Sequence, residues 1–224
     1  MKTIPIITFF LCTVMYAHAQ LNIVPKNDGL KEYDSLTNVE KRSFTSLPGQ
    51  TLYMHGVKND RNGYWDAFYT VNFLTGDDRT VYKAVNISTT PSKEVVGKYY
   101  EVVKVWTKTD YLSAGCCLLL REKESGDEMY YNPFRYPLSM TCIGYYEKLK
   151  RFVGQTFLSL AKAVETEDGQ VITPAEGAEY RCVDIGLKMN SDGAFLLMEG
   201  ADGVRVEAFP IGGDEVYEFV STAR

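Results

Sequence analysis

The chain has 224 residues, with 24 basic and 29 acidic side chains, and its net charge is −5 at neutral pH. No block of Lys and Arg occurs in it, which argues against a nucleic-acid or anionic-membrane partner, because both are recognised largely through phosphate charge. Aromatic residues make up 13% of the chain, including 16 tyrosines. Rings are therefore available both for a core and for a binding surface.

The first 19 residues have the pattern of a secretory signal peptide. Lys2 precedes an apolar run from Ile4 to Tyr16, and Ala17-His18-Ala19 has the form of a cleavage site. The run is shorter than the ~20 apolar residues that a membrane-spanning helix needs. We expect cleavage before Gln20, export, and a mature chain that does not insert into the membrane.

After a polar N-terminal segment, residues 20–43, the sequence repeats itself. Gly49-Gln50-Thr51 returns as Gly154-Gln155-Thr156, and apolar residues follow each copy. Recurring phrases of this kind indicate a duplicated module. Two longer phrases also recur, residues 97–105 as 177–185 and residues 119–126 as 196–203.

Each copy is predicted to be a small all-β domain introduced by a short helix. We place the first copy at residues 44–144 and the second at 145–224, with helical lead-in segments at 38–42 and 145–151. Runs rich in β-branched and aromatic residues follow each lead-in. Three dipeptides in the second copy are typical of tight turns between strands: Asp168-Gly169, Asp192-Gly193 and Asp202-Gly203.

The first copy carries an insertion, at about residues 62–85, that has the pattern of a long hairpin. If its first strand alternates regularly, Trp65 and Tyr69 lie on a core face, whereas Tyr64 and Phe68 lie on the opposite, amphipathic face. The insertion has no counterpart of similar length in the second copy.

Few residues suit catalysis. His55 is the one histidine after the leader, and no metalloprotease, nucleophile-elbow, dinucleotide or phosphate-loop motif is present. We expect no cofactor, no metal and no catalytic residue. A thiol paired with His55 remains an alternative.

The four cysteines after the leader are Cys116, Cys117, Cys142 and Cys182. We expect buried thiols that fill the core, and a Cys117–Cys142 disulfide stays open as an alternative, because exported proteins can keep disulfides. Adjacent Cys116 and Cys117 point to opposite faces of a strand.

Acidic residues gather at turns, where they are more typical of turn chemistry than of a glycosidase pair or a calcium loop.

Tyrosines concentrate in the first copy, and they are the best candidates for a recognition surface. A tyrosine combines an apolar ring with a polar tip, which suits binding to peptides, glycans or proteins. We predict that Tyr64, Trp65, Phe68 and Tyr130 form the ligand-binding site.

The sequence resembles exported proteins of Bacteroidetes-type bacteria that contain SH3-like barrels. The likeness rests on the Ala17-His18-Ala19-Gln20 junction, the phrase from Lys148 to Phe157 and the rhythm of the strands. It implies two related SH3-like small barrels in the periplasm or at the cell surface. Such modules act as non-catalytic binding units for cell-wall peptides or protein partners, and the ligand cannot be carried over.

We therefore expect a secreted, non-catalytic binding or scaffolding protein of the bacterial envelope that recognises a peptide, a glycan or a protein partner. Two alternatives remain open. One is a hydrolase of envelope glycans or peptides, which a concave pair of carboxylates would favour. The other is a structural subunit of a surface assembly, joined by strand pairing at the exposed hairpin edge, residues 79–85.

Overall fold

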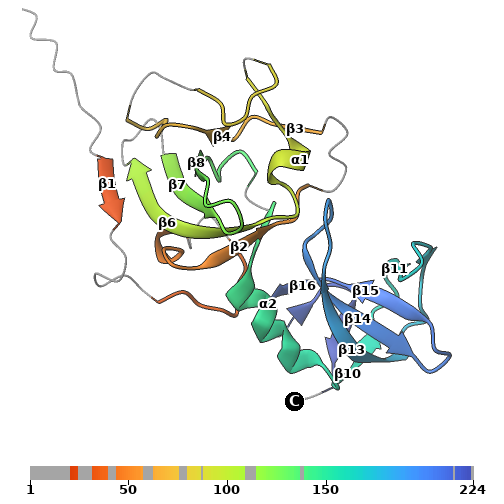
Figure 1. Cartoon of the computed structure of the whole chain (residues 1–224). Coiled ribbons are helices and arrows are strands. Elements are labelled where there is room, and N and C mark those ends of the chain that lie inside the picture. Colours follow the sequence, from red (N-terminus) through yellow and green to blue (C-terminus); the bar gives the residue numbers. More distant parts are fainter. Residues whose placement is uncertain are drawn as a thin grey trace, which may run out of the picture.

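A computed structural model gives the structure of the chain, which is mostly β (Figure 1). The predicted all-β class is therefore confirmed. The predicted leader lies outside the described residues, as does half of the N-terminal segment. The structure describes residues 21–24, 32–39, 44–57, 63–75, 80–86, 88–108, 115–136, 139–213 and 215–222.

The first large sheet belongs to the first copy. Its strands run in the order β4-β8-β7-β6-β2-β9, all antiparallel, and β1 pairs with the far end of the long strand β6. The strands are β1 (Leu21–Val24), β2 (Thr51–Met54), β4 (Phe68–Tyr69), β6 (Tyr99–Lys108), β7 (Gly115–Glu122), β8 (Glu128–Tyr131) and β9 (Met140–Cys142).

The second large sheet belongs to the second copy, and its order is β12-β11-β15-β14-β13-β10-β18. Among the described residues each order starts and ends with a different strand, so both sheets are open and do not close into the barrels expected from the sequence. The strands are β10 (Thr156–Ser159), β11 (Val164–Thr166), β12 (Val171–Ile172), β13 (Glu179–Leu187), β14 (Ala194–Gly200), β15 (Arg205–Ala208) and β18 (Phe219–Ser221).

Short elements complete the fold. Two small antiparallel sheets accompany the large ones, β3 with β5 in the first copy and β16 with β17 in the second. Their strands are β3 (Tyr64–Trp65), β5 (Thr90–Pro91), β16 (Pro210–Gly212) and β17 (Glu215–Val216). The helical segments are η1 (Phe44–Ser46), α1 (Ser92–Val95), α2 (Ile143–Leu149) and η2 (Lys150–Phe152), of which η1 and η2 are 3₁₀ turns.

The two sheets are built on one plan. Strands β4, β8, β7, β6, β2 and β9 take the same order as β11, β15, β14, β13, β10 and β18. Both long strands also carry an irregularity at the same place, between Val102 and Lys104 in β6 and between Cys182 and Asp184 in β13. A shared order and a shared bulge at aligned residues support the duplication hypothesis, because bulges are specific features of a fold.

The register corrects one of the sequence correspondences by a single residue. Val102 pairs with Leu120, whereas the equivalent Cys182 pairs with Met198. The residue that corresponds to Met198 is therefore Leu120 and not Arg121, which the repeated phrases had set opposite it. The β7–β8 turn is longer than the β14–β15 turn. This extra length compensates for the one-residue shift, so that Gly126 again corresponds to Gly203, as the repeated phrases predicted.

The lead-in helices differ between the copies. Residues 145–151 lie in α2 and η2, as predicted. In the first copy Asn38 and Val39 are not helical, the rest of the predicted helix lies outside the described residues, and a 3₁₀ turn occupies residues 44–46 instead. The three predicted Asp-Gly turns are confirmed, since each glycine has a positive φ and joins two strands.

The predicted long hairpin is much less regular than its sequence pattern. Pairing of Phe68 and Thr70 with the segment at residues 80–82 gives it a short hairpin base. Its first strand, however, is interrupted by a bend at Asp66 and Ala67. Residues 62 and 76–79 lie outside the described part of the chain.

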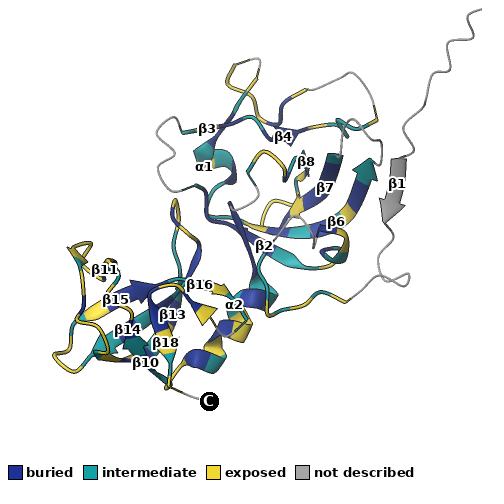
Figure 2. Cartoon of the chain, turned by 180° about the vertical axis from the view of Figure 1, so that it is seen from behind, coloured by how far each residue is buried: buried dark blue, intermediate teal, exposed yellow. Residues whose placement is uncertain are grey.

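One continuous apolar core runs through both copies, and Figure 2 shows buried residues on strands of both sheets and on α2. Tyr145 and Leu149 of α2 belong to this core together with Leu52 of β2 and Phe157 of β10. The two copies are therefore packed onto one shared helix rather than joined by an exposed linker.

The β13–β14 turn makes a second contact between the copies, and in Figure 1 this hairpin reaches toward β2. His55, just after β2, is 1% exposed; its Nδ1 donates to the carbonyl oxygen of Ser191 at 2.9 Å, and its own carbonyl accepts from the Asn190 N–H. Gly193 closes the contact, with φ at +87°. The turn therefore packs against buried polar groups of the first copy.

Gly193 is predicted to be essential to this contact. A Cβ there would lie 2.5 Å from Thr141 Oγ1 and 2.8 Å from His55 Nε2. We expect Gly193→Ala to lower the free energy of unfolding by about 2–4 kcal/mol, from the positive φ and from overlap. The matched control is Gly203→Ala, where φ is +78° and nothing lies within 4 Å, with an expected loss near 1 kcal/mol. Equal losses in denaturant titrations would contradict the packing at Gly193.

His55 should also make stability depend on pH. Burial lowers its pKa from the ordinary 6.5, so the unfolded chain binds the proton more readily, and His55 stabilises the fold fully above pH 6.5. As pH falls below 6.5 toward the folded-state pKa, stability falls by at most about 1.4 kcal/mol per pH unit. His55→Gln should remove this part of the pH dependence of the free energy of unfolding, measured by urea titrations between pH 7 and pH 5. If the free energy of unfolding changes with pH in the same way in the variant and in the native chain, the prediction is wrong.

Candidate functional site

The predicted site residues of the first copy do not form one exposed surface. Tyr64 is 48% exposed, as expected, and lies on β3. Trp65 is buried, as predicted for its face of the strand, and so it belongs to the core rather than to a surface. Its Nε1 donates to Ser92 Oγ at 2.9 Å. Tyr130 lies half-buried on β8, in a different sheet from Tyr64.

Phe68 is the clearest correction. It is fully buried, and its ring centroid lies 4.9 Å from that of Tyr131 and 6.2 Å from that of Trp65. The bend at Asp66 and Ala67 breaks the two-residue alternation, so that Phe68 turns inward with Trp65 instead of opposite to it. Phe68 is therefore a core residue and not part of a binding surface.

The outer face of the first sheet is largely covered as well. Trp106, Cys117 and Leu119 form a second, smaller buried cluster there. Tyr130 packs against Trp106 with ring centroids 5.8 Å apart, and Phe73 and Leu74 of the inserted segment pack on the same cluster. The inserted segment thus covers aromatic residues that the sequence suggested would be exposed.

The four cysteines of the described chain are buried and free. Cys116 belongs to the main core and Cys117 to the outer cluster, which confirms that they point to opposite faces; the alternative Cys117–Cys142 disulfide is not formed. Burial raises the pKa of Cys116 to about 12 and that of Cys182 to about 11. Thiols with such values stay protonated at neutral pH, and a protonated thiol is a poor nucleophile.

His55 does not activate a thiol. Its Nδ1 is directed to Ser191 of the second copy, whereas the Cys142 Sγ lies 3.8 Å from Gln50 Oε1. The β13–β14 turn covers His55, which is buried. The thiol–imidazole alternative therefore has no geometric support here.

A hollow lies in the second copy, where the sequence did not place the site. It has a volume of about 650 Å³, within the range of small-ligand sites. Its lining comes from the β11–β12 hairpin, the β13–β14 turn, strands β14, β15 and β16 and the segment between β17 and β18, with smaller contributions from the N-terminal segment and α2. Its lining consists of Asn38, Val39, Tyr145, Ala163, Val164, Glu165, Val171, Asp192, Ala194, Glu207, Phe209, Pro210, Ile211, Gly212, Tyr217 and Glu218. We call this hollow the acidic cavity.

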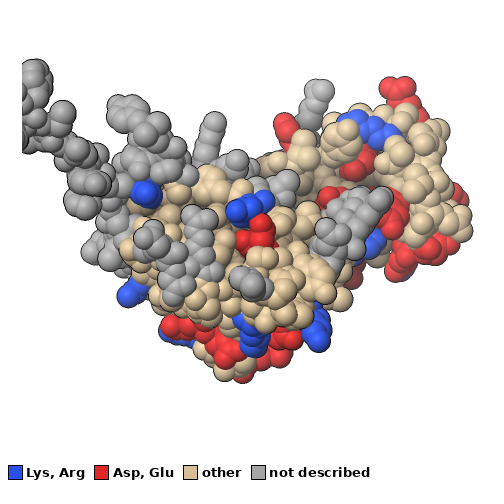
Figure 3. Space-filling model, turned by 90° about the horizontal axis from the view of Figure 1, so that it is seen from above, with Lys and Arg blue, Asp and Glu red and all other residues tan. Residues whose placement is uncertain are grey.

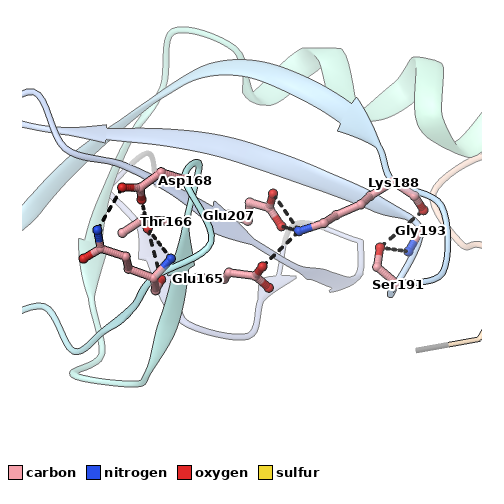
Figure 4. A network of polar contacts seen from close by, with 8 residues as sticks. Glu165, Thr166, Asp168, Lys188, Ser191, Gly193 and Glu207 are labelled. Atoms are coloured by element: carbon pink, nitrogen blue, oxygen red, sulfur yellow. Dashed lines mark hydrogen bonds and ion pairs between the residues drawn. The ribbon is translucent and has the colours of Figure 1, made fainter. Parts of the chain in front are cut away.

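Lys188 holds two of the carboxylates of the acidic cavity in place. Its side chain extends from the end of β13 between Glu207 and Glu165 (Figure 4). Its Nζ lies 3.0 Å from Glu207 Oε2 and 3.2 Å from Glu165 Oε1. Burial opposes the charged ammonium, but the bonds to Glu207 and Glu165 outweigh it and raise the pKa of Lys188.

Glu218 lies in a different environment. It is 7% exposed, and the Phe209 N–H donates to its Oε2 at 3.0 Å. Burial raises the pKa of Glu218, although the Phe209 N–H and the charge of Lys162 act in the opposite direction. The acidic cavity thus has one carboxylate that takes up a proton more readily than usual, beside a pair of carboxylates that share one lysine.

The rim of the acidic cavity is apolar and open to solvent. Val171 is 73% exposed, Ile211 58% and Tyr217 53%, and all three line the cavity. Lys162 Nζ lies 3.6 Å from the centre of the Tyr217 ring. Exposed apolar side chains gathered around a hollow are typical of binding sites.

A second, more open hollow lies along the β11–β12 turn and has a volume of about 790 Å³. Its polar groups are already engaged with one another. Asp168 accepts from Gln170 Nε2 at 3.0 Å and from the Thr166 hydroxyl, and Arg205 pairs with Glu199 at 2.7 Å. These contacts are turn chemistry, as the sequence indicated.

Sequence reasoning missed Glu207 and Glu218 as site residues. One signal was available: the alignment of the copies sets Glu207 opposite Tyr130, within the strand-forming phrase Val206-Glu207-Ala208. A charged residue inside an apolar strand must find a partner. That partner, Lys188, lies just after β13 and could not be read from spacing.

Among the described residues, no group of three or more His, Cys, Asp or Glu side chains is placed to hold a metal ion. The same part of the chain contains no helix long and apolar enough to cross a membrane. Comparisons with family models, with curated proteins and with solved structures each find no match.

The packing predicts contrasting effects at two of the residues that the sequence singled out. Phe68→Ala should lower the free energy of unfolding by about 3–5 kcal/mol, because it leaves a cavity beside Tyr131 and Trp65. Tyr64→Ala should change it by no more than about 0.5 kcal/mol, because the ring is half exposed. Denaturant titrations of both variants test this; similar, small losses would show that Phe68 is not a core residue.

Proposed function

We propose that the chain is an exported, non-catalytic binding or scaffolding protein of the bacterial envelope. Its partner is a peptide, a glycan or a protein, and it acts in the periplasm or at the cell surface. The proposal includes the finer fold assignment, two related modules of the SH3-like type. The leader pattern at residues 1–19 and the resemblance of the sequence support export and the module type.

The acidic cavity with its apolar rim is the observation that carries this proposal. Val171, Ile211 and Tyr217 expose apolar surface around a hollow whose interior is polar, and this is the usual layout of a recognition site. The first copy then serves as a support, since its aromatic face is covered by the inserted segment and its core continues through α2. We therefore move the proposed binding site from Tyr64 and Tyr130 to the second copy.

A hydrolase of envelope glycans or peptides is the second candidate, and one observation favours it. Glu218 and Glu207 line the same cavity in unlike environments, one buried with a raised pKa and one paired with Lys188. Two carboxyl groups that differ in this way are what a general acid and its partner require. Binding is preferred because the buried thiols and His55 add no further catalytic group.

A thermal-shift screen of residues 20–224 tests the proposed function. We expect at least one member of a panel of cell-wall peptides and oligosaccharides to raise the melting temperature, because a ligand of the folded state stabilises it. The shift should fall by more than half in a Val171→Ala/Ile211→Ala variant, which removes part of the rim.

The matched control is Leu160→Ala/Val220→Ala, which removes two comparably exposed side chains outside the acidic cavity and should keep the full shift. A shift lost equally in both variants, or no shift with any ligand, would count against the cavity as a binding site. Turnover of a panel member that Glu218→Gln abolishes would establish the hydrolase instead.

A further inference from the structure

The charge of the acidic cavity indicates the kind of ligand that it takes. Among the described residues, four carboxylates and no basic side chain line it, namely Glu165, Asp192, Glu207 and Glu218. Lys188 lies behind this lining and compensates part of the charge, with its Nζ bonded to Glu207 and Glu165. Acidic side chains are also prominent on the second copy in the space-filling view, at the right of Figure 3. The cavity therefore favours a cation over an anion.

Glu218 is the carboxylate best placed to receive that cation. The Phe209 N–H fixes its Oε2, while Lys188 bonds to the other two glutamates and not to Glu218. An ammonium group beside Glu218 would favour its ionised form and offset the effect of burial. A neutral or anionic ligand would leave that effect in place.

The rim fits a cation carried on an apolar stem. Val171 and Ile211 offer aliphatic surface, and Tyr217 offers the face of a ring. Lys162 already places its ammonium over that ring and donates to the Tyr217 carbonyl oxygen at 2.6 Å, so the ring contributes apolar surface for the stem rather than a free face for the ligand's ammonium. A lysine side chain combines four methylene groups with a terminal ammonium and so matches both the rim and the interior.

The position of β12 favours a peptide as the carrier of this lysine. β12 ends the second sheet, pairing with β11 alone among the described strands, and its Val171 lies on the cavity rim. An edge strand can pair with an extended peptide through backbone hydrogen bonds. A peptide along this edge has its side chains beside the cavity opening.

We infer that the acidic cavity binds a lysine side chain of an extended peptide, with the ammonium at Glu218 and the stem between Val171, Ile211 and Tyr217. This inference rests on the proposed binding function and narrows it to one ligand chemistry. It adds a binding residue, Glu218, that lies outside the predicted aromatic surface.

Calorimetric titration of residues 20–224 with capped three-residue peptides tests the inference. The probes are acetyl-Ala-Lys-Ala-amide, the same peptide with norleucine, which keeps the stem without the charge, and the same peptide with glutamate. We expect the lysine peptide to bind at least ~10-fold more tightly than either of the others, a difference of about 1.4 kcal/mol. Its affinity should fall as salt is raised, because the interaction is partly ionic.

Variants locate the site. Glu218→Gln should weaken binding of the lysine peptide at least ~10-fold, whereas Glu215→Gln, which changes an exposed glutamate outside the cavity, should not change it. If Glu218→Gln folds poorly, the comparison of lysine and norleucine peptides on the native chain still decides the question.

The outcomes separate this inference from the proposed function. Equal affinity for lysine and norleucine peptides, tighter binding of a glucosamine oligomer, or unchanged binding in Glu218→Gln would overturn the inference. If a neutral ligand shifts the melting temperature through the Val171/Ile211 rim while the lysine peptide shows no binding, the inference fails and the binding function stands. If nothing binds in either experiment, both fail.

Discussion

The ion pair between Lys188 and Glu207 is the interaction on which the arrangement of the acidic cavity depends. The Glu207 side chain is 8% exposed, and a carboxylate so far from water is costly unless it is paired and hydrogen-bonded. Lys188 donates a hydrogen bond to each carboxylate oxygen of Glu207 and another to Glu165. Neighbouring strands can therefore place acidic groups at one cavity. Without this lysine, the acidic cavity would be an unfavourable cluster of like charges.

Lys188 also connects the cavity with the junction between the copies. It stands at the start of the β13–β14 turn, which also contains Ser191 and Gly193 (Figure 4). Ser191 and Gly193 pack against His55 and next to Thr141. The turn therefore carries both the contact with His55 and, at its start, the lysine that bonds to Glu207 and Glu165.

The two copies show how one plan supports different surfaces. The strand position that carries Tyr130 in the first copy carries Glu207 in the second. In the first copy the tyrosine packs on Trp106 under the inserted segment; in the second the acid pairs with Lys188 beside an open hollow. The two copies share a fold, and the role of each surface depends on its particular side chains and on the segments that cover them.

The amino-acid sequence by itself determined the all-β class, the repeated phrases, the Asp-Gly turns and the helix at residues 145–151, because turn chemistry and local periodicity fix these features within a few residues. It failed at Phe68, where a bend reversed the alternation and turned the ring into the core. The tertiary structure alone decided which aromatics are covered, that His55 is buried by a distant turn, and that Glu165, Glu207 and Glu218 line one cavity. These outcomes depend on contacts between strands far apart in the chain, and no local pattern of residues contains them.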